Sequence, residues 1–153
     1  MPSAPMRAFL GFVAGAISVL TFHQGMIALL HTLGASSYAP YRIGSVPPFG
    51  VPIIVDLCFW GGLYGLVFGL LMPRFTWPHW LCGLALGIIS VLIGMFVVAP
   101  LKGNPIAHGG HLWPIGRTLL INGFWGVGVG VLLPMLLPRT LVKAHGERQL
   151  SSR

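Results

Sequence analysis

Acidic residues are nearly absent from this chain: Asp56 and Glu147 are the only two among its 153 residues. Charged residues of both signs make up 7% of the sequence, whereas hydrophobic residues make up 55%, and the mean hydropathy is +0.85. A water-soluble domain carries about 25% charged residues, which cover much of its surface. This shortage of charge excludes a soluble domain and predicts that the chain lies in a membrane.

The sequence also lacks the motifs that many enzymes use. It contains no G-x-S-x-G, no H-E-x-x-H, no glycine-rich phosphate-binding loop and no paired carboxylates. Its two cysteines, Cys58 and Cys82, are expected at opposite depths of the membrane, where they cannot form a disulfide, and they form no C-x-x-C metal motif. We therefore expect a protein that is not an enzyme.

Long continuous apolar runs are what the chain has instead. Crossing a bilayer takes about 20 helical residues, and four runs are long enough: 8–33, 51–72, 80–99 and 116–137. The first run is too long for a signal peptide and has no small-x-small cleavage site after it. The prediction is an all-α, polytopic membrane protein with one four-helix transmembrane domain over residues 1–138 and a basic cytoplasmic tail over residues 139–153.

The distribution of positive charge predicts the orientation. From the predicted spans, one side of the membrane is expected to contain Arg7, Arg74, Arg139, Lys143, Arg148 and Arg153. The other side is expected to contain Arg42, Lys102 and Arg117. Because basic residues accumulate in cytoplasmic segments, we expect a multi-pass protein of the bacterial inner membrane with both termini in the cytoplasm. The net charge of +7 forms no basic face, so the expected partner is the lipid bilayer and not nucleic acid.

Two sequence patterns occur twice. Residues 11–20 match residues 83–92 at an offset of 72, and residues 59–74 match residues 124–139 at an offset of 65. These matches predict two tandem helical hairpins that enter the membrane in the same direction, related by a pseudo-twofold axis along the membrane normal. Chance matches among glycine and aliphatic residues are the alternative.

Glycines four residues apart occur in all four runs, and this spacing lets helix backbones approach closely. They are Gly11 and Gly15; Gly61, Gly65 and Gly69; Gly83 and Gly87; and Gly126 and Gly130. The pattern predicts packing seams, either within one chain or between the chains of a homo-oligomer or larger complex.

Polar residues gather toward the outer ends of the predicted helices. At a rise of about 1.5 Å per residue, His23, Asp56 and Asn122 lie at a similar depth, with Arg117 nearer the surface. A charged side chain at the centre of a membrane helix costs about 2.5–3.5 kcal/mol, so Asp56 is expected to face the bundle interior. Two compatible interpretations are open: an Asp56–Arg117 ion pair between helices, or an Asp56–His23 pair that relays protons or binds a ligand.

The first helix carries further polar side chains. Gln24 and His31 are seven residues apart and share a face, with Thr21 within one turn of it. Such a stripe either lines a crevice or hydrogen-bonds neighbouring helices. Haem is not expected, because His23 and His31 lie on one helix and cannot ligate iron from opposite faces.

A second histidine cluster lies in the last outer loop. His108 and His111 flank two glycines, and with His31 and Asp56 they would form a nitrogen and oxygen site for zinc or copper. The alternative is that both are solvated loop histidines.

Several motifs together carry a resemblance that spans nearly the whole chain. They are Phe22-His23-Gln24, Pro47-Pro48-Phe49-Gly50-Val51-Pro52, Phe59-Trp60-Gly61-Gly62, Pro100-Leu101-Lys102-Gly103 and Asn122-Gly123-Phe124-Trp125-Gly126. The set resembles a family of small, uncharacterised four-span bacterial inner-membrane proteins. This resemblance implies a four-helix membrane fold and no particular activity.

The sequence leaves two functions open. In the first, an outward-facing polar pocket binds or passes a small solute, proton or metal ion. Asp56 is then the charge anchor, His23 its titrating partner, Arg117 and Asn122 the polar wall, and His108 and His111 a possible mouth. In the second, the chain is an accessory or assembly subunit of a larger membrane complex and has no ligand of its own.

Overall fold

The computed structural model describes residues 2–47 and 50–138, and most of these residues are helical. Four helices are long and apolar enough to cross a membrane: Ala4–Thr32, Ile53–Arg74, His79–Leu101 and Leu112–Leu136. The prediction of an all-α protein with four helices of membrane-spanning length is confirmed. The predicted tail, 139–153, lies outside the described residues.

Two of the four spans contain a π-helical turn. The first span consists of α1 (Ala4–Ser18), the π-turn η1 (Val19–His23) and α2 (Gln24–Thr32). The second consists of α3 (Ile53–Leu71) and the 3-10 turn η2 (Met72–Arg74), and the third of α4 (His79–Ile93), the π-turn η3 (Gly94–Val98) and α5 (Ala99–Leu101). The fourth is the single helix α6 (Leu112–Leu136). Outside the spans, β1 (Ser45–Val46) pairs antiparallel with β2 (Val51–Pro52), and η4 (Ile106–Gly110) precedes α6.

Prolines mark three of the helix starts. Pro5 lies in the first turn of α1, and Pro52 and Pro78 directly precede α3 and α4. Proline has no N–H to donate and a fixed φ, so it is tolerated where the first helical N–H groups have no partner. The observed starts at Ala4 and Leu112 lie one turn before the predicted starts at residues 8 and 116.

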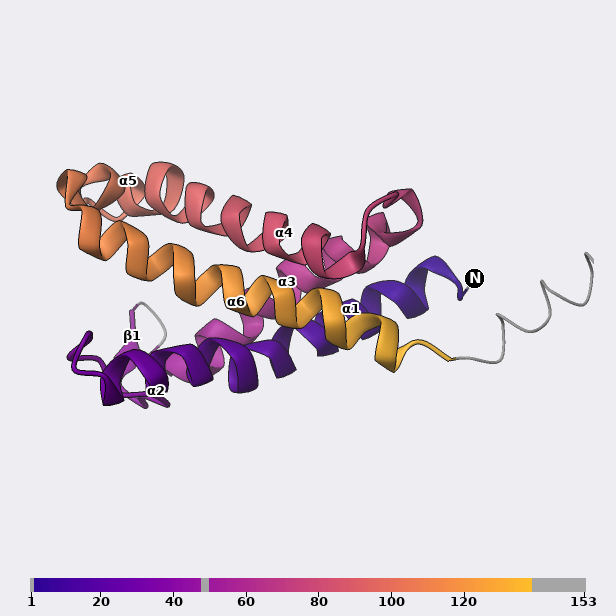
Figure 1. The fold of residues 1–153 in the computed structure, drawn as a ribbon, viewed down its shortest axis with the longest axis horizontal. Coiled ribbons are helices and arrows are strands. Elements are labelled where there is room, and N and C mark those ends of the chain that lie inside the picture. Colours follow the sequence, from indigo (N-terminus) through magenta and orange to yellow (C-terminus); the bar gives the residue numbers. More distant parts are fainter. Residues whose placement is uncertain (1, 48–49, 139–153) are drawn as a thin grey trace, which may run out of the picture.

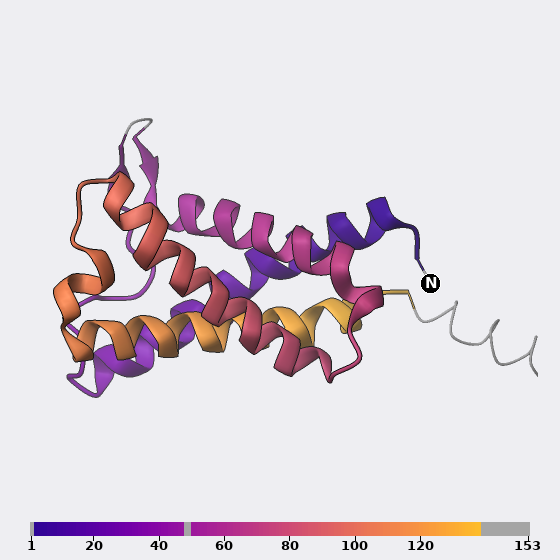
Figure 2. The same ribbon diagram turned by 90° about the horizontal axis from the view of Figure 1, so that it is seen from above.

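The helices pack as two pairs joined at the centre. α1 packs along α3, α4 packs along α6, and α1 also contacts α6 (Figures 1 and 2). One end of the bundle, which we call the terminal end, contains the start of α1, the connection from α3 to α4 and the end of α6. The opposite end, which we call the loop end, contains the segments after α2 and α5 (Figure 2).

Glycine backbones bring the helices of each pair into direct contact. A Cβ atom added at Gly11 or Gly15 would overlap a backbone oxygen of α3, and one added at Gly83 or Gly87 would overlap a backbone oxygen of α6. Helices in membranes associate through van der Waals packing, which is strongest at such close approach. The predicted glycine seams therefore lie within one chain, a point that the spacing alone left open.

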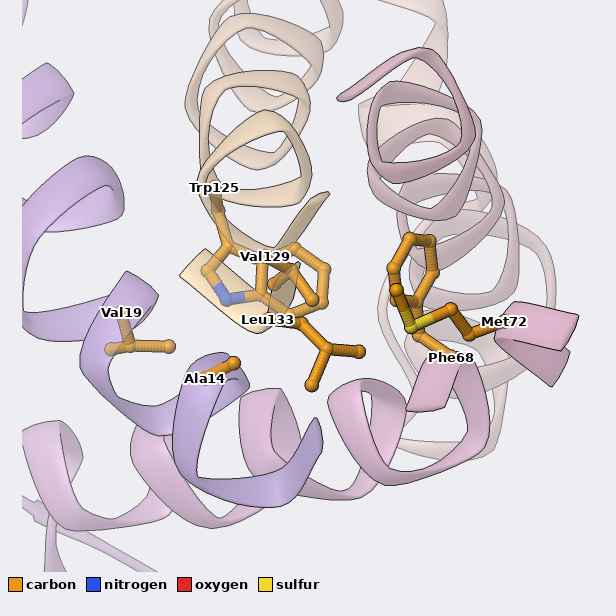
Figure 3. Close-up of a cluster of buried hydrophobic side chains, with 7 residues drawn as sticks. All are labelled: Ala14, Val19, Phe68, Met72, Trp125, Val129 and Leu133. Atoms are coloured by element: carbon orange, nitrogen blue, oxygen red, sulfur yellow. The ribbon is translucent and has the colours of Figure 1, made fainter. Parts of the chain in front are cut away.

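The buried apolar core lies where α1, α3 and α6 meet (Figure 3). Its members are Ala14, Val19, Phe68, Met72, Trp125, Val129 and Leu133. Two hydrogen bonds link α1 to α6 beside this core: the Trp125 indole Nε1 donates to the Gly15 oxygen at 3.1 Å, and the Ser18 hydroxyl donates to the Trp125 oxygen at 2.6 Å. These bonds connect the α1–α3 pair to the α4–α6 pair.

Candidate functional site

The π-turn η1 changes which side chains of the first span face inward. A π-turn bonds each residue to the one five positions on, so it shifts the helical register of the residues after it. His23 is 9% exposed and Gln24 is 2% exposed, whereas Thr21 and His31 are exposed. Of the predicted polar stripe, only Gln24 is therefore buried. Gln24 and His31 both lie in the regular helix α2, but the loop after α2 folds back onto Gln24 and leaves His31 exposed.

The buried Gln24 amide is held by two groups. Its Oε1 accepts a hydrogen bond from the Tyr41 backbone N–H at 2.7 Å, which leaves its Nε2 facing the His23 Nδ1 at 3.3 Å. The amide nitrogen can only donate, so the His23 Nδ1 accepts, and a neutral His23 carries its proton on Nε2. The Tyr41 hydroxyl also donates to the Leu20 oxygen at 2.8 Å. Gln24 and Tyr41 thus fix the loop after α2 against the helix.

A pocket of about 210 Å³ lies beside this histidine at the loop end, and we name it the guanidinium pocket. Its apolar wall includes Ile53, Ile54 and Leu57 of α3. Its polar side chains come from the first span, the loop after it and α6: His23, Gln24, Ser36, Tyr38, Arg42, Arg117, Thr118 and Asn122. The structure thus brings together four of the predicted residues, His23, Gln24, Arg117 and Asn122.

Tyr38 gathers two cations at this pocket. The Arg117 Cζ lies 4.7 Å from the centroid of the Tyr38 ring, and the Arg42 Cζ lies 5.2 Å from it. Each distance is within the range of a cation–π contact, worth about 0.5–1 kcal/mol at an exposed site. The two guanidiniums are therefore within about 10 Å of each other, where their repulsion is about 0.4 kcal/mol in water and about 1.7 kcal/mol at an effective dielectric of about 20.

Asp56 lies elsewhere. Together with Val55, Phe59 and Trp60 it lines a separate groove of about 470 Å³, the Asp56 groove, which Lys102 also lines. Its sequence neighbour Leu57 lines the guanidinium pocket, so Asp56 lies at a similar level of α3. The Asp56 carboxylate, however, is on another face of this helix. The expectations that Asp56 faces the bundle interior and pairs with His23 or Arg117 are thus not met, and no Asp56–Arg117 ion pair occurs among residues 2–47 and 50–138.

The physical reason for this placement is the composition of α3. The helix is apolar on every side, so its sequence does not specify which face turns inward. Asp56 lies in the first turn of α3, where the positive end of the helix dipole stabilises a carboxylate by about 0.3–1 kcal/mol. The helix dipole therefore stabilises Asp56 where it lies, on a face of α3 away from the guanidinium pocket.

The loop histidines do not form a compact cluster. The His108 Nε2 lies 3.3 Å from the Thr118 hydroxyl, and His111 is exposed. His31 is at the other loop, where its Nδ1 lies 3.1 Å from the Ser36 oxygen. Within the described part of the chain, no group of three or more His, Cys, Asp or Glu side chains could hold a metal ion, so His31 and Asp56 do not join His108 and His111.

A further pocket of about 410 Å³ lies between α6 and the third span, and we name it the α4–α6 pocket. His108, Asn104, Ser90 and the π-turn η3 contribute to it. Thr118 and Asn122 line both this pocket and the guanidinium pocket. These two side chains of α6 therefore form a wall between the two hollows.

Four polar residues of the guanidinium pocket were not among the predicted site residues: Ser36, Tyr38, Arg42 and Thr118. Arg42 and Tyr38 were visible in the sequence only as a loop charge and an interfacial aromatic residue. Their position depends on the Tyr41–Gln24 hydrogen bond, which folds the loop back onto the helix. No local sequence pattern indicates such a long-range bond.

In comparisons with known proteins, no family model, no curated protein and no solved structure matches the chain. The function is therefore inferred from the geometry of the pocket.

Proposed function

We propose that this protein is a small, integral, non-enzymatic membrane protein that binds a small polar solute in its guanidinium pocket. The observation that carries the proposal is the composition of that pocket: eight of its 14 lining residues have polar side chains, in a chain that is 55% hydrophobic. Polar groups within membrane helices are costly and commonly mark solute pathways or binding sites. A polar pocket at one end of an apolar bundle is a suitable geometry for such binding.

The volume supports a small ligand. Drug-sized molecules occupy pockets of about 300–1,000 Å³, and the guanidinium pocket has about 210 Å³. A proton relay has less support than solute binding, because Asp56 is not among the residues that line the pocket with His23.

We place the protein in the bacterial inner membrane with its loop end facing outward. Under this orientation the guanidinium pocket opens to the periplasm. The basic residues that favour this orientation over the reverse belong mostly to 139–153, since the described segments contribute Arg7 and Arg74 at the terminal end against Arg42, Lys102 and Arg117 at the loop end.

We also propose that the two helix pairs arose by duplication and are related by a pseudo-twofold axis along the membrane normal. Backbone contacts at Gly11 with Gly65 and at Gly15 with Gly61 correspond to those at Gly83 with Gly126 and at Gly87 with Asn122. The offset is 72 for the first helix of each pair, as in the sequence match, but 61 for the second, whereas the sequence match gives 65. The second helix of one pair would then have slipped by one helical turn along its partner, relative to the other pair. A π-turn in the first helix of each pair, η1 and η3, is a further feature common to both halves.

Thermal unfolding of the protein in detergent micelles tests the proposed function. A panel of small neutral, anionic and cationic solutes is added in turn, and at least one is expected to raise the unfolding temperature. Asn122→Ala removes a pocket side chain and should reduce that rise, while Asp56→Asn changes a polar residue on another face of α3 and should leave it unchanged.

If no solute of any charge stabilises the protein, the binding proposal fails. The rival function, an accessory or assembly subunit, also predicts that no solute stabilises the protein. It further predicts that native gels of membranes containing the Asn122→Ala variant show less of a larger complex.

A further inference from the structure

The guanidinium pocket carries two positive charges and no negative one. Arg42 and Arg117 line it, and none of its 14 lining residues is Asp or Glu. Asp56, the sole acidic residue in the part of the chain that the structure describes, lines the Asp56 groove instead. No carboxylate of residues 2–47 or 50–138 therefore neutralises this pair of arginines.

The two arginines are held together by one ring. Their Cζ atoms lie 4.7 Å and 5.2 Å from the Tyr38 centroid, although they come from different parts of the chain: Arg117 from α6 and Arg42 from the loop before β1. Like charges this close repel each other, and an anion that lies near both would offset this repulsion. A ring contact also leaves the N–H groups at the edge of each guanidinium able to donate.

From this arrangement we infer that the guanidinium pocket binds a small oxyanion, a carboxylate or phosphate group, through Arg42 and Arg117; the inference rests on the proposed solute-binding function. A guanidinium presents parallel N–H donors that match two oxygens of a carboxylate or phosphate. Two guanidiniums also disfavour a metal ion or any other cation at the same place.

The remaining polar groups are compatible with an acceptor-rich ligand. The contact with the Gln24 amide fixes the neutral His23 as a donor at Nε2, so the imidazole adds a further N–H donor to the lining groups. The Asn122 Nδ2 and the Thr118 hydroxyl are each bonded to a carbonyl of their own helix, at 3.0 Å and 2.9 Å, so both side chains are held in place.

The volume limits the ligand. About 210 Å³ is below the roughly 300–1,000 Å³ of pockets that hold drug-sized molecules. An acetate-sized or phosphate-sized group suits this space. The oxyanion has two possible sources, a free solute or the phosphate of a lipid headgroup, because the pocket lies at the loop end of a membrane-spanning bundle.

Binding of acetate and of acetamide separates charge from shape. The two molecules have nearly the same size, so an oxyanion site should bind acetate, and also phosphate, while acetamide and methylammonium have little effect. The measurement is thermal unfolding of the whole protein in detergent at constant ionic strength, with sodium chloride as the reference salt.

Arginine variants identify the groups that bind the anion. Arg117→Gln and Arg42→Gln should weaken acetate or phosphate binding by about 10- to 100-fold, because each removes charged donors. Arg117→Lys keeps the charge but loses the paired N–H donors, so it should weaken binding by about tenfold. Lys102→Gln is the matched control: it removes a loop-end charge that lines the Asp56 groove, and binding should persist. Unfolding of each variant without added anion detects any that fail to fold.

Lipid bilayer discs separate the two sources. Native mass spectrometry of the protein from discs with an anionic phospholipid tests for retained lipid, and loss of that lipid in Arg117→Gln would support the inference with a headgroup as the source. Stabilisation by free acetate or phosphate in lipid-free detergent supports a soluble source. If acetamide or methylammonium stabilises the protein as much as acetate does, the oxyanion inference is overturned while the solute-binding function stands. If nothing binds, both fail.

Discussion

Gly15→Ala provides a direct test of the packing between the first two spans. A Cβ at this position would overlap the backbone oxygen of Gly61, which cannot move without displacing α3. Inserting a methyl group into a tightly packed contact costs about 1–3 kcal/mol. The same change improves helix propensity by about 0.8–1.0 kcal/mol. The expected net effect is a loss of up to about 2 kcal/mol of unfolding free energy.

Gly25→Ala is the matched control. Gly25 lies in α2, and a Cβ added there would meet nothing within 4 Å. The propensity gain applies without the clash, so this variant should be more stable than the wild type by up to about 1 kcal/mol. The difference between the two variants cancels the propensity term and isolates the packing cost, about 1–3 kcal/mol.

The assay is reversible unfolding in mixed micelles of a mild detergent and sodium dodecyl sulfate, followed by tryptophan fluorescence or circular dichroism. Both variants and the wild type are measured under identical conditions. Equal stabilities for Gly15→Ala and Gly25→Ala would refute the backbone contact between α1 and α3.

Three further predictions concern single polar groups. Trp125→Phe removes the bond from the indole to the Gly15 oxygen and should lower the unfolding free energy by about 0.5–1.5 kcal/mol, whereas Trp113→Phe at the exposed start of α6 should change it little. Gln24→Ala leaves the part-buried Tyr41 N–H without its acceptor, so amide hydrogen exchange at Tyr41 should speed up by about 2- to 10-fold, for the loss of a hydrogen bond worth about 0.5–1.5 kcal/mol; unchanged exchange would exclude the bond. Asp56→Asn should cost about 0.3–1 kcal/mol by weakening the dipole interaction in the first turn of α3, and a loss of several kcal/mol would indicate a partner that this structure does not contain.

The helices themselves could be predicted from the sequence because length and apolarity determine a membrane span. Glycine spacing also indicated close packing, but it could not say which glycines meet. That information depends on how far one helix slides along another, and the contact of Gly83 with Gly126 differs by one turn from the contact that the sequence match implies.

The candidate site was only partly predictable. Depth can be counted along a helix, and His23 and Asn122, which were expected at one level, line the same pocket. The side of a helix that faces the bundle cannot be counted in this way. Asp56 was misplaced because α3 is apolar all round, and His31 was misplaced because the loop after α2 folds back onto Gln24 and not onto His31.

Thr118 and Asn122 are the common boundary of the guanidinium pocket and the α4–α6 pocket. A ligand that hydrogen-bonds to either side chain from one pocket would change the groups that a ligand in the other pocket can reach. The two occupancies would then be thermodynamically linked, and by reciprocity each ligand would alter the affinity for the other by the same factor. A single turn of α6 would be the element that the two binding equilibria share.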